Sequence, residues 1–103
     1  MVRVEDVARA VADVALAVPG VASLSPGRGI EVSTQFSGGK VVGVRFTPDG
    51  VTVAIVADRV PLPEIANEVT ASVRRVLSAM GDGRPVTVVV DDLVPEALSR
   101  RVG

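Results

Sequence analysis

The spacing of apolar residues near the start of the chain follows the period of an α-helix. Residues 4–18 place valines and alanines three and four positions apart, while the charged residues fall on another face. Pro19 then prevents a helix from continuing, and Gly20 tolerates the left-handed backbone of a helix exit. The pattern predicts an amphipathic helix over 4–18 that ends in an architectural corner.

After the corner, apolar residues alternate with polar ones, which is typical of β-strands. The alternation predicts strands over 21–25, 30–34, 40–47 and 51–57. In the second of these we expect Ile30 and Val32 to share one face. Thr47-Pro48-Asp49-Gly50 predicts a hairpin between the last two strands, because its proline presets a turn and its glycine accepts a positive φ angle.

The second half of the chain predicts a helix, a strand and a short terminal helix. The helix covers 63–80 and carries one apolar stripe. The strand covers 86–91, with valines on one face and Thr87 and Val89 on the other, which favours a central place in the sheet. A proline at its start favours the terminal helix over 95–102.

The order of these elements is helix, three or four strands, helix and strand. It predicts an α+β fold, a two-layer sandwich in which two helices cover one face of a small mixed or antiparallel sheet. At 103 residues, 48% of them hydrophobic, we expect a single domain over 1–103. Only Phe36 and Phe46 are aromatic, so the core must rely on small side chains.

The balance of charges argues against a polyanionic partner. Eleven basic and twelve acidic residues give a formal net charge of −1, which supplies no field to attract nucleic acid. The chain lacks the GXXG loop of KH-type RNA-binding domains, and two phenylalanines cannot supply the stacking aromatics of the RRM type. We therefore do not expect nucleic acid as a partner.

The sequence also favours a cytoplasmic location. It contains no cysteine, so neither a disulfide nor a thiolate ligand can form. Glu5, Asp6 and Asp13 interrupt the segment where a signal peptide needs a cationic start and an unbroken apolar stretch. No apolar run approaches the roughly 18 residues of a membrane span, so we expect no direct membrane insertion.

Candidate chemistry is sparse. Histidine and cysteine are both absent, which removes the commonest general base, the thiol nucleophile and most transition-metal ligand sets. A hydrolase built only from serine, lysine and carboxylates is the alternative that stays open at this point. We expect no enzymatic activity, no cofactor and no metal. Residues 25–29 (SPGRG) and 37–40 (SGGK) are glycine-rich, but neither has the Gly-Lys-Ser/Thr ending of a phosphate loop before a helix, so we interpret both as turns.

Two charged groups remain as weaker candidates for ligand binding. Asp58, Asp91 and Asp92 offer oxygen ligands to a hard cation, but successive residues of a strand point to opposite faces, which favours solvated strand ends. Arg74 and Arg75 have the charge to bind phosphate or carboxylate. We favour a solvated helix end for this pair, because basic residues there complement the helix dipole.

Three stretches of sequence carry a resemblance to a known family. They are VARAVADVALAVPGVASLS at 7–25, DGVTVAIVADRVPLPEIANEVTASVRRVLSAMG at 49–81 and VTVVVDDL at 86–93. In their order and spacing they resemble the alkaline shock protein family of bacterial envelope stress response proteins. The shared features are a Val-Pro-Gly-Val corner after the first helix, a helix that starts at Pro-Glu and closes on Met-Gly, and a last valine strand.

The resemblance implies a non-enzymatic cytoplasmic protein that acts as a scaffold or interaction module at the inner face of the cell membrane. Some relatives self-associate and are recruited by a membrane-anchored protein, so the resemblance implies a protein partner and allows a homo-oligomer. Two alternatives stay open. A nucleic-acid-binding domain would lose affinity steeply with salt, and a small-ligand regulatory domain needs an apolar pocket with converging polar groups.

The C-terminal tail holds the candidate partner-binding residues. They form an apolar stripe beside two arginines: Leu93, Val94, Leu98, Arg100, Arg101 and Val102. A short terminal helix of this kind is suited to a groove on a partner. The competing interpretation is that the tail covers the chain's own sheet or frays, as terminal segments commonly do.

Overall fold

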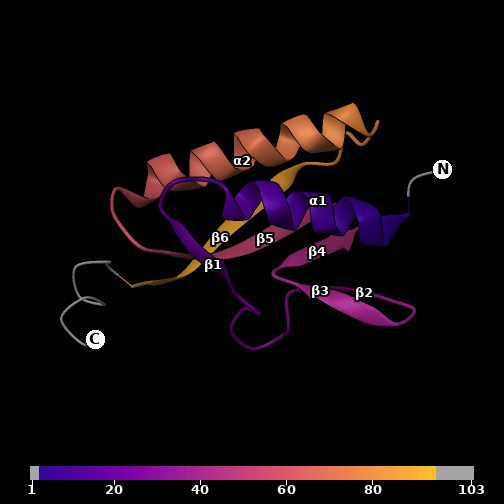
Figure 1. The fold of residues 1–103 in the computed structure, drawn as a ribbon, viewed down its shortest axis with the longest axis horizontal. Coiled ribbons are helices and arrows are strands. Elements are labelled where there is room, and N and C mark those ends of the chain that lie inside the picture. The colour runs from indigo at the N-terminus through magenta and orange to yellow at the C-terminus, as the bar shows by residue number, and fades with distance from the viewer. Residues whose placement is uncertain (1–2, 95–103) are drawn as a thin grey trace.

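The computed structural model describes residues 3–94 and shows two helices on one face of a sheet (Figure 1). The elements follow one another as α1 (Val4–Leu16), β1 (Val21–Leu24), β2 (Ser33–Phe36), β3 (Gly39–Val42), β4 (Val44–Thr47), β5 (Gly50–Ala57), α2 (Leu62–Ala79) and β6 (Val86–Leu93). This architecture confirms the predicted α+β fold class. The sheet is mixed, because β5 pairs antiparallel with β1 and β4 and parallel with β6.

β5 is the central strand, and its neighbour on one side is divided in two. β1 pairs with the C-terminal half of β5 and β4 with its N-terminal half, through the hairpin predicted at 47–50. Between them, the Ala54 N–H donates to the Gly43 carbonyl (2.9 Å) and the Ala54 carbonyl accepts from the Ser25 N–H (2.8 Å). β1 and β4 therefore lie along the same side of β5, and β6 lies on the other side.

The chain leaves the sheet between β1 and β4 and forms the β2–β3 hairpin. Gly43 ends this excursion with a φ of +92°, and a Cβ at this position would lie 2.6 Å from Leu24 Cβ. The predicted continuous strand over 40–47 is therefore wrong. The backbone turns at Gly43, so that β3 and β4 belong to different sheets.

The strand predicted over 30–34 starts later in the chain than predicted, and the expectation that Ile30 and Val32 share a strand face is wrong. β2 begins only at Ser33, and Ile30 lies in the preceding loop with 79% of its surface exposed. The physical reason is local hydrogen bonding. The Val32 N–H donates to the Pro26 carbonyl (2.7 Å), so the segment closes on itself as a compact loop instead of extending.

The core lies between the two helices and the inner face of β5. Each helix contributes one face, and β5 contributes alternate residues. The most deeply buried side chains of this core are Ala8, Val11, Ala15, Val44, Val51, Val53, Ile55, Ala57, Val69, Val73 and Leu77. Among the described residues, no aromatic side chain is fully buried, so small and branched side chains fill the core as the composition predicts.

The corner after α1 is built as its sequence predicts, although the helix ends at Leu16. Gly20 has a φ of +100°, and a Cβ at this position would lie 2.7 Å from Ile65 Cδ1. Its carbonyl accepts a hydrogen bond from the Asp58 N–H just after β5 (2.8 Å). The corner therefore brings α1, β1, the end of β5 and the start of α2 together.

The final strand is longer than predicted, and it lies at an edge of the sheet. β6 runs Val86–Leu93 and pairs only with β5 among the described strands, so the predicted central position is wrong. Its inner valines pack against the core, whereas Val89 on the outer face is 38% exposed. An apolar residue on the outer face of this strand marks an exposed sheet surface rather than a second neighbouring strand.

Candidate functional site

The structure describes two of the six predicted partner-binding residues. Leu93 ends β6, and its side chain packs against the hydrophobic core. Val94 is exposed, and its N–H donates to the Ala57 carbonyl at the end of β5 (2.8 Å). The other four predicted residues and the predicted helix over 95–102 lie outside the described residues: Leu98, Arg100, Arg101 and Val102. Leu93 is thus part of the sheet, and the tail begins beside the end of β5.

The outer edge of β6 has no strand beside it within the described part of the chain. The Val51 N–H donates to the Pro85 carbonyl (2.9 Å), so this carbonyl faces β5. Because alternate residues of a parallel pair turn their main-chain groups to opposite sides, those of Val86, Val88 and Val90 face outward. A row of this kind is a template for a strand of another chain.

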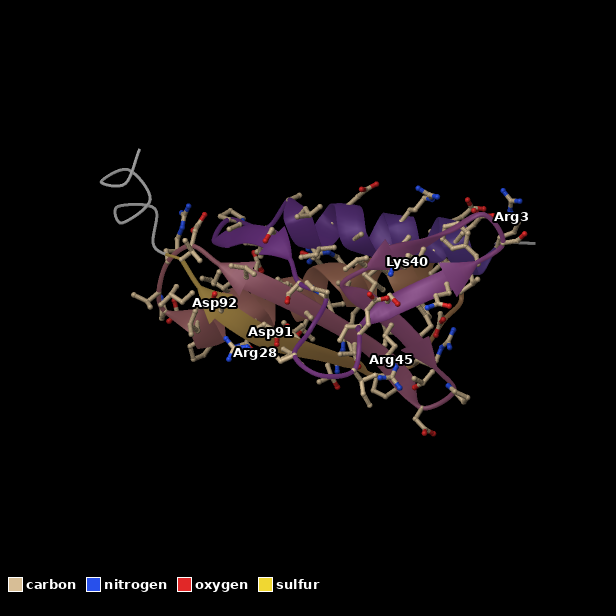
Figure 2. The ribbon with its side chains drawn as sticks, turned by 90° about the horizontal axis from the view of Figure 1, so that it is seen from below. Arg3, Arg28, Lys40, Arg45, Asp91 and Asp92 are labelled. Atoms are coloured by element: carbon tan, nitrogen blue, oxygen red, sulfur yellow. The ribbon has the colours of Figure 1, made fainter. Side chains whose placement is uncertain are left out.

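A β-bulge at Asp91 ends the free row. The β5–β6 register shifts there, so that Asp91 is an extra residue before Asp92. The Arg28 Nη2 donates to the Asp91 carbonyl (2.6 Å), which places the loop after β1 across the outer face of β5. Figure 2, viewed from the side away from the helices, shows Arg28 close to Asp91. The bulge also interrupts the strict alternation from which the sequence placed the two aspartates on opposite faces.

A groove of about 490 Å³ lies between the corner after α1 and the first turns of α2. It is lined by apolar and polar side chains in equal number: Pro19, Val60, Pro61 and Ile65, with Arg59, Glu64, Asn67 and Glu68. The Arg59 Nε lies 2.7 Å from Asp58 Oδ1, which offsets the charge of this arginine. The groove therefore combines an apolar surface with the net negative charge of Glu64 and Glu68.

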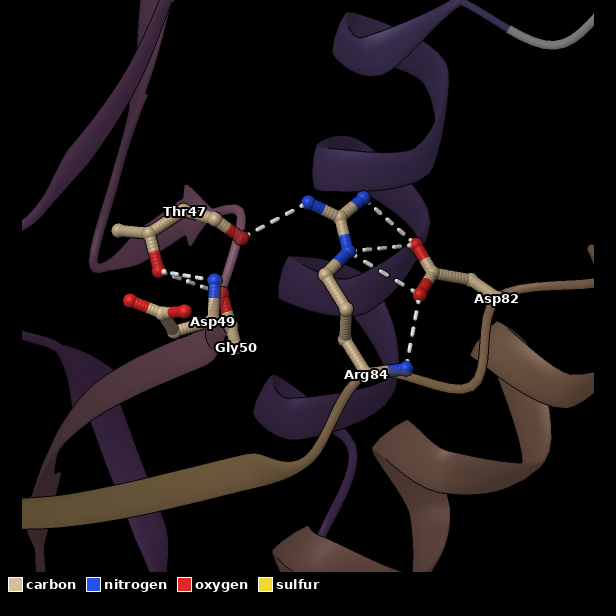
Figure 3. Close-up of polar contacts among 5 residues, drawn as sticks. All are labelled: Thr47, Asp49, Gly50, Asp82 and Arg84. Atoms are coloured by element: carbon tan, nitrogen blue, oxygen red, sulfur yellow. Dashed lines mark hydrogen bonds and ion pairs between the residues drawn. The ribbon is translucent and has the colours of Figure 1, made fainter.

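Arg84 ties the loop before β6 to the β4–β5 hairpin (Figure 3). Its Nη2 lies 2.7 Å from Asp82 Oδ2, and its Nη1 donates to the Thr47 carbonyl (3.0 Å). The guanidinium also lies over the Phe46 ring, 5.0 Å from its centre. Hydrogen bonds from the side chain and backbone of Arg84 lower the pKa of Asp82. The cluster holds two loops together. The Arg84 guanidinium is already paired with Asp82, so it is not free to bind a ligand.

The two glycine-rich segments are turns, in agreement with our interpretation. In the first, the Gly27 N–H donates to Ser25 Oγ (3.1 Å). The second, over 37–40, connects β2 to β3. Because neither segment leads directly into a helix, neither presents the helix N-terminus on which a phosphate loop depends.

The charged groups weighed as ligand sites are also dispersed. Residues 3–94 contain no group of three or more His, Cys, Asp or Glu residues that could hold a metal ion. Arg75 Nη2 donates to Ser72 Oγ on its own helix (3.2 Å), and Arg74 beside it is exposed. No helix in this part of the chain is long and apolar enough to span a membrane.

Sequence reasoning missed both the free edge and the groove. The signal for the edge was the charged pair that follows the valines of β6, since edge strands commonly carry charges. The groove had no comparable signal, because its lining comes from the corner at Pro19, the loop at Val60 and the helix at Glu68. Only the fold brings these three segments together.

Comparison of the chain with protein-family models, curated protein sequences and solved structures gives no match. The resemblance to the alkaline shock protein family therefore rests on the three stretches of sequence alone. The geometry of the β6 edge and of the groove is the remaining basis for a functional proposal.

Proposed function

We propose that this chain is a non-enzymatic interaction module that binds an extended segment of a partner protein along the outer edge of β6. The observation that carries this proposal is the outward-facing row of main-chain groups at Val86, Val88 and Val90. The inner face of the strand already packs against the core, so the row is held in place before a partner arrives. Main-chain hydrogen bonds along such an edge supply affinity.

The opposite edge of the sheet is a poorer docking site. β1 has only four residues and a register shift between Val21 and Ser23. The β2–β3 hairpin covers part of β4, where Thr34 Oγ1 donates to the Val44 carbonyl (2.7 Å). β6 therefore offers the longer uninterrupted row.

The side chains around the row favour a partner segment that is apolar with a basic end. Thr87 and Val89 are exposed on the outer face of β6, and Asp92 is exposed near its C-terminal end. Alternate side chains of an added strand would lie beside these groups and supply selectivity. A cationic side chain opposite Asp92 would complement its charge.

The biological setting of the proposal rests on the resemblance. It implies an envelope stress response protein that acts as a scaffold near the cytoplasmic face of the membrane. A membrane-anchored partner with an extended segment would recruit such a scaffold through β6. This assignment requires no reaction and no cofactor.

Proline substitution tests the role of the edge. Val88→Pro removes an outward N–H and obstructs an added strand, but leaves the β5–β6 ladder its inward-facing bonds. Ala22→Pro is the matched control, because Ala22 sits at the register shift of β1, where proline is tolerated. Affinity capture from native membranes and cytosol should recover a partner with the wild type and Ala22→Pro but not with Val88→Pro. Equal recovery by a folded Val88→Pro chain would contradict the proposal.

A further inference from the structure

The groove beside the start of α2 presents two carboxylates next to an apolar surface. Glu64 and Glu68 are four residues apart on α2, and both are exposed. Neither has an ion-pair partner within residues 3–94. Residues four apart on a helix are neighbours, and Glu64 and Glu68 both line the same groove.

The segment after β6 carries the complementary groups. Residues 95–103 read PEALSRRVG, with Arg100 and Arg101 adjacent and with Leu98 and Val102 on either side of them. An arginine guanidinium is planar and pairs with a carboxylate through two parallel hydrogen bonds. The two arginines equal the two glutamates in number and are opposite to them in charge.

The groove is also within reach of this segment. The tail starts after Val94, whose N–H donates to the Ala57 carbonyl (2.8 Å). Arg59, which lines the groove, follows Ala57 by two residues. Arg100 follows Val94 by six residues, and six extended residues span about 20 Å. The tether therefore starts next to the groove and is long enough to enter it.

We propose that this groove binds residues 95–103 of the same chain, with Arg100 and Arg101 paired to Glu64 and Glu68 and an aliphatic neighbour on the apolar lining. The ligand class is a short peptide with adjacent arginines between aliphatic residues. The proposal goes beyond the interaction function, because it assigns a ligand to the groove and leaves the β6 edge to the partner.

The tether favours the chain's own tail over a second copy. A short covalent connection holds a tethered segment at an effective concentration on the order of millimolar. A second copy at micromolar concentration competes poorly against that value for the same groove. Apolar surface at Val60, which is 67% exposed at the groove, would be covered by the tail.

A spin label on the full chain tests the proposal. The sequence contains no cysteine, so Ser99→Cys gives a single site for a nitroxide beside the two arginines. In the labelled chain, the backbone amides of Ile65 and Glu68 should lose nuclear magnetic resonance intensity through paramagnetic relaxation. The loss should become much weaker in Glu64→Gln/Glu68→Gln and, independently, in Arg100→Gln/Arg101→Gln. The second pair lies outside the described fold, so its result does not depend on the stability of α2.

Matched controls separate the specific pairing from general charge. Asp13→Asn/Asp49→Asn removes two exposed carboxylates that also have no ion-pair partner within the described residues, and it should leave the intensity loss intact. No loss in the labelled wild type, or an unchanged loss in Glu64→Gln/Glu68→Gln, would overturn the proposal.

Mixing tests whether the tail acts within one chain. Unlabelled ¹⁵N chain combined with labelled ¹⁴N chain should show no intensity loss at the groove. A loss in this mixture would mean that a second copy fills the groove, and would overturn the assignment to the same chain. None of these measurements involves the partner, so the groove proposal and the β6 proposal can fail separately.

Discussion

Gly20 holds a backbone conformation that a side chain resists, and it does so where four elements meet. Gly20→Val should destabilise the fold by on the order of 1 kcal/mol or more, because the backbone has a positive φ and a Cβ would lie 2.7 Å from Ile65 Cδ1. Urea unfolding measures the change. Gly83→Val is the control, since nothing lies within 4 Å of a Cβ at that position. A midpoint for Gly20→Val equal to that of the wild type would refute the architectural role of the corner.

Asp82 makes part of the stability depend on pH. Hydrogen bonds from Arg84 lower the folded-state pKa of Asp82 below its ordinary value of 3.8. A lowered folded-state pKa contributes stability above the unfolded-state pKa, and the contribution is lost as pH falls through the folded-state value. Asp82→Asn should therefore be less stable than the wild type at neutral pH, and the difference should shrink as pH falls below 3.8.

Denaturant unfolding of both chains from neutral pH down to pH about 2 checks this dependence, because that range passes through the ordinary pKa of an aspartate. Glu31→Gln provides the comparison. The hydrogen bond from Lys40 lowers the pKa of Glu31, but this pair is exposed and we expect a smaller effect at neutral pH. A gap between Asp82→Asn and wild type that stayed constant across the range would contradict the assigned role of Asp82.

Among the elements, the β2–β3 hairpin is attached to the main sheet through few contacts. The buried hydrogen bond from Thr34 Oγ1 to the Val44 carbonyl is one of them. Thr34→Val keeps the shape of the side chain but removes this bond, so it should lower the free energy of unfolding by about 1 kcal/mol. Thr70→Val is the control, since Thr70 Oγ1 only donates back to Ala66 in its own helix (2.8 Å). Equal stability of the two variants would mean that the Thr34 bond does not anchor the hairpin.

The helices and strands also show which parts of the secondary structure can be predicted from sequence patterns alone. The helix predicted over 63–80 forms as α2 (Leu62–Ala79), and the hairpin at 47–50 forms as predicted, because local signals determine both. The strand predicted over 40–47 breaks at Gly43. The alternation of apolar residues continues through this glycine, so the pattern gives no sign that the backbone changes direction there.

At the scale of the whole molecule, the near-neutral charge predicts weak interaction with polyanions. Fluorescence anisotropy with a single-stranded RNA should show no binding at physiological salt, because a net charge of −1 gives no general attraction to phosphates. Binding at low salt that fell steeply as salt increased would favour the nucleic-acid alternative. A partner captured equally well at low and high salt would argue against it.

The candidate site depends on the whole fold more than the elements do. The sequence predicts that the valines of β6 lie in a strand. It does not predict that their main-chain groups face outward, because this follows from β6 pairing with β5 on one side only. Glu64 and Glu68 read as ordinary charged residues near a helix start. They line a groove only because the fold places the corner at Pro19 and the loop at Val60 beside them.

Hydrogen exchange along β6 tests the central claim most directly. In the free chain, the amides of Val86, Val88 and Val90 should exchange faster than those of Thr87 and Val89, which face β5. In the complex with the captured partner, the outward amides should become protected, because they would donate to an added strand. Exchange at these amides that remained as fast in the complex as in the free chain would contradict binding along the β6 edge.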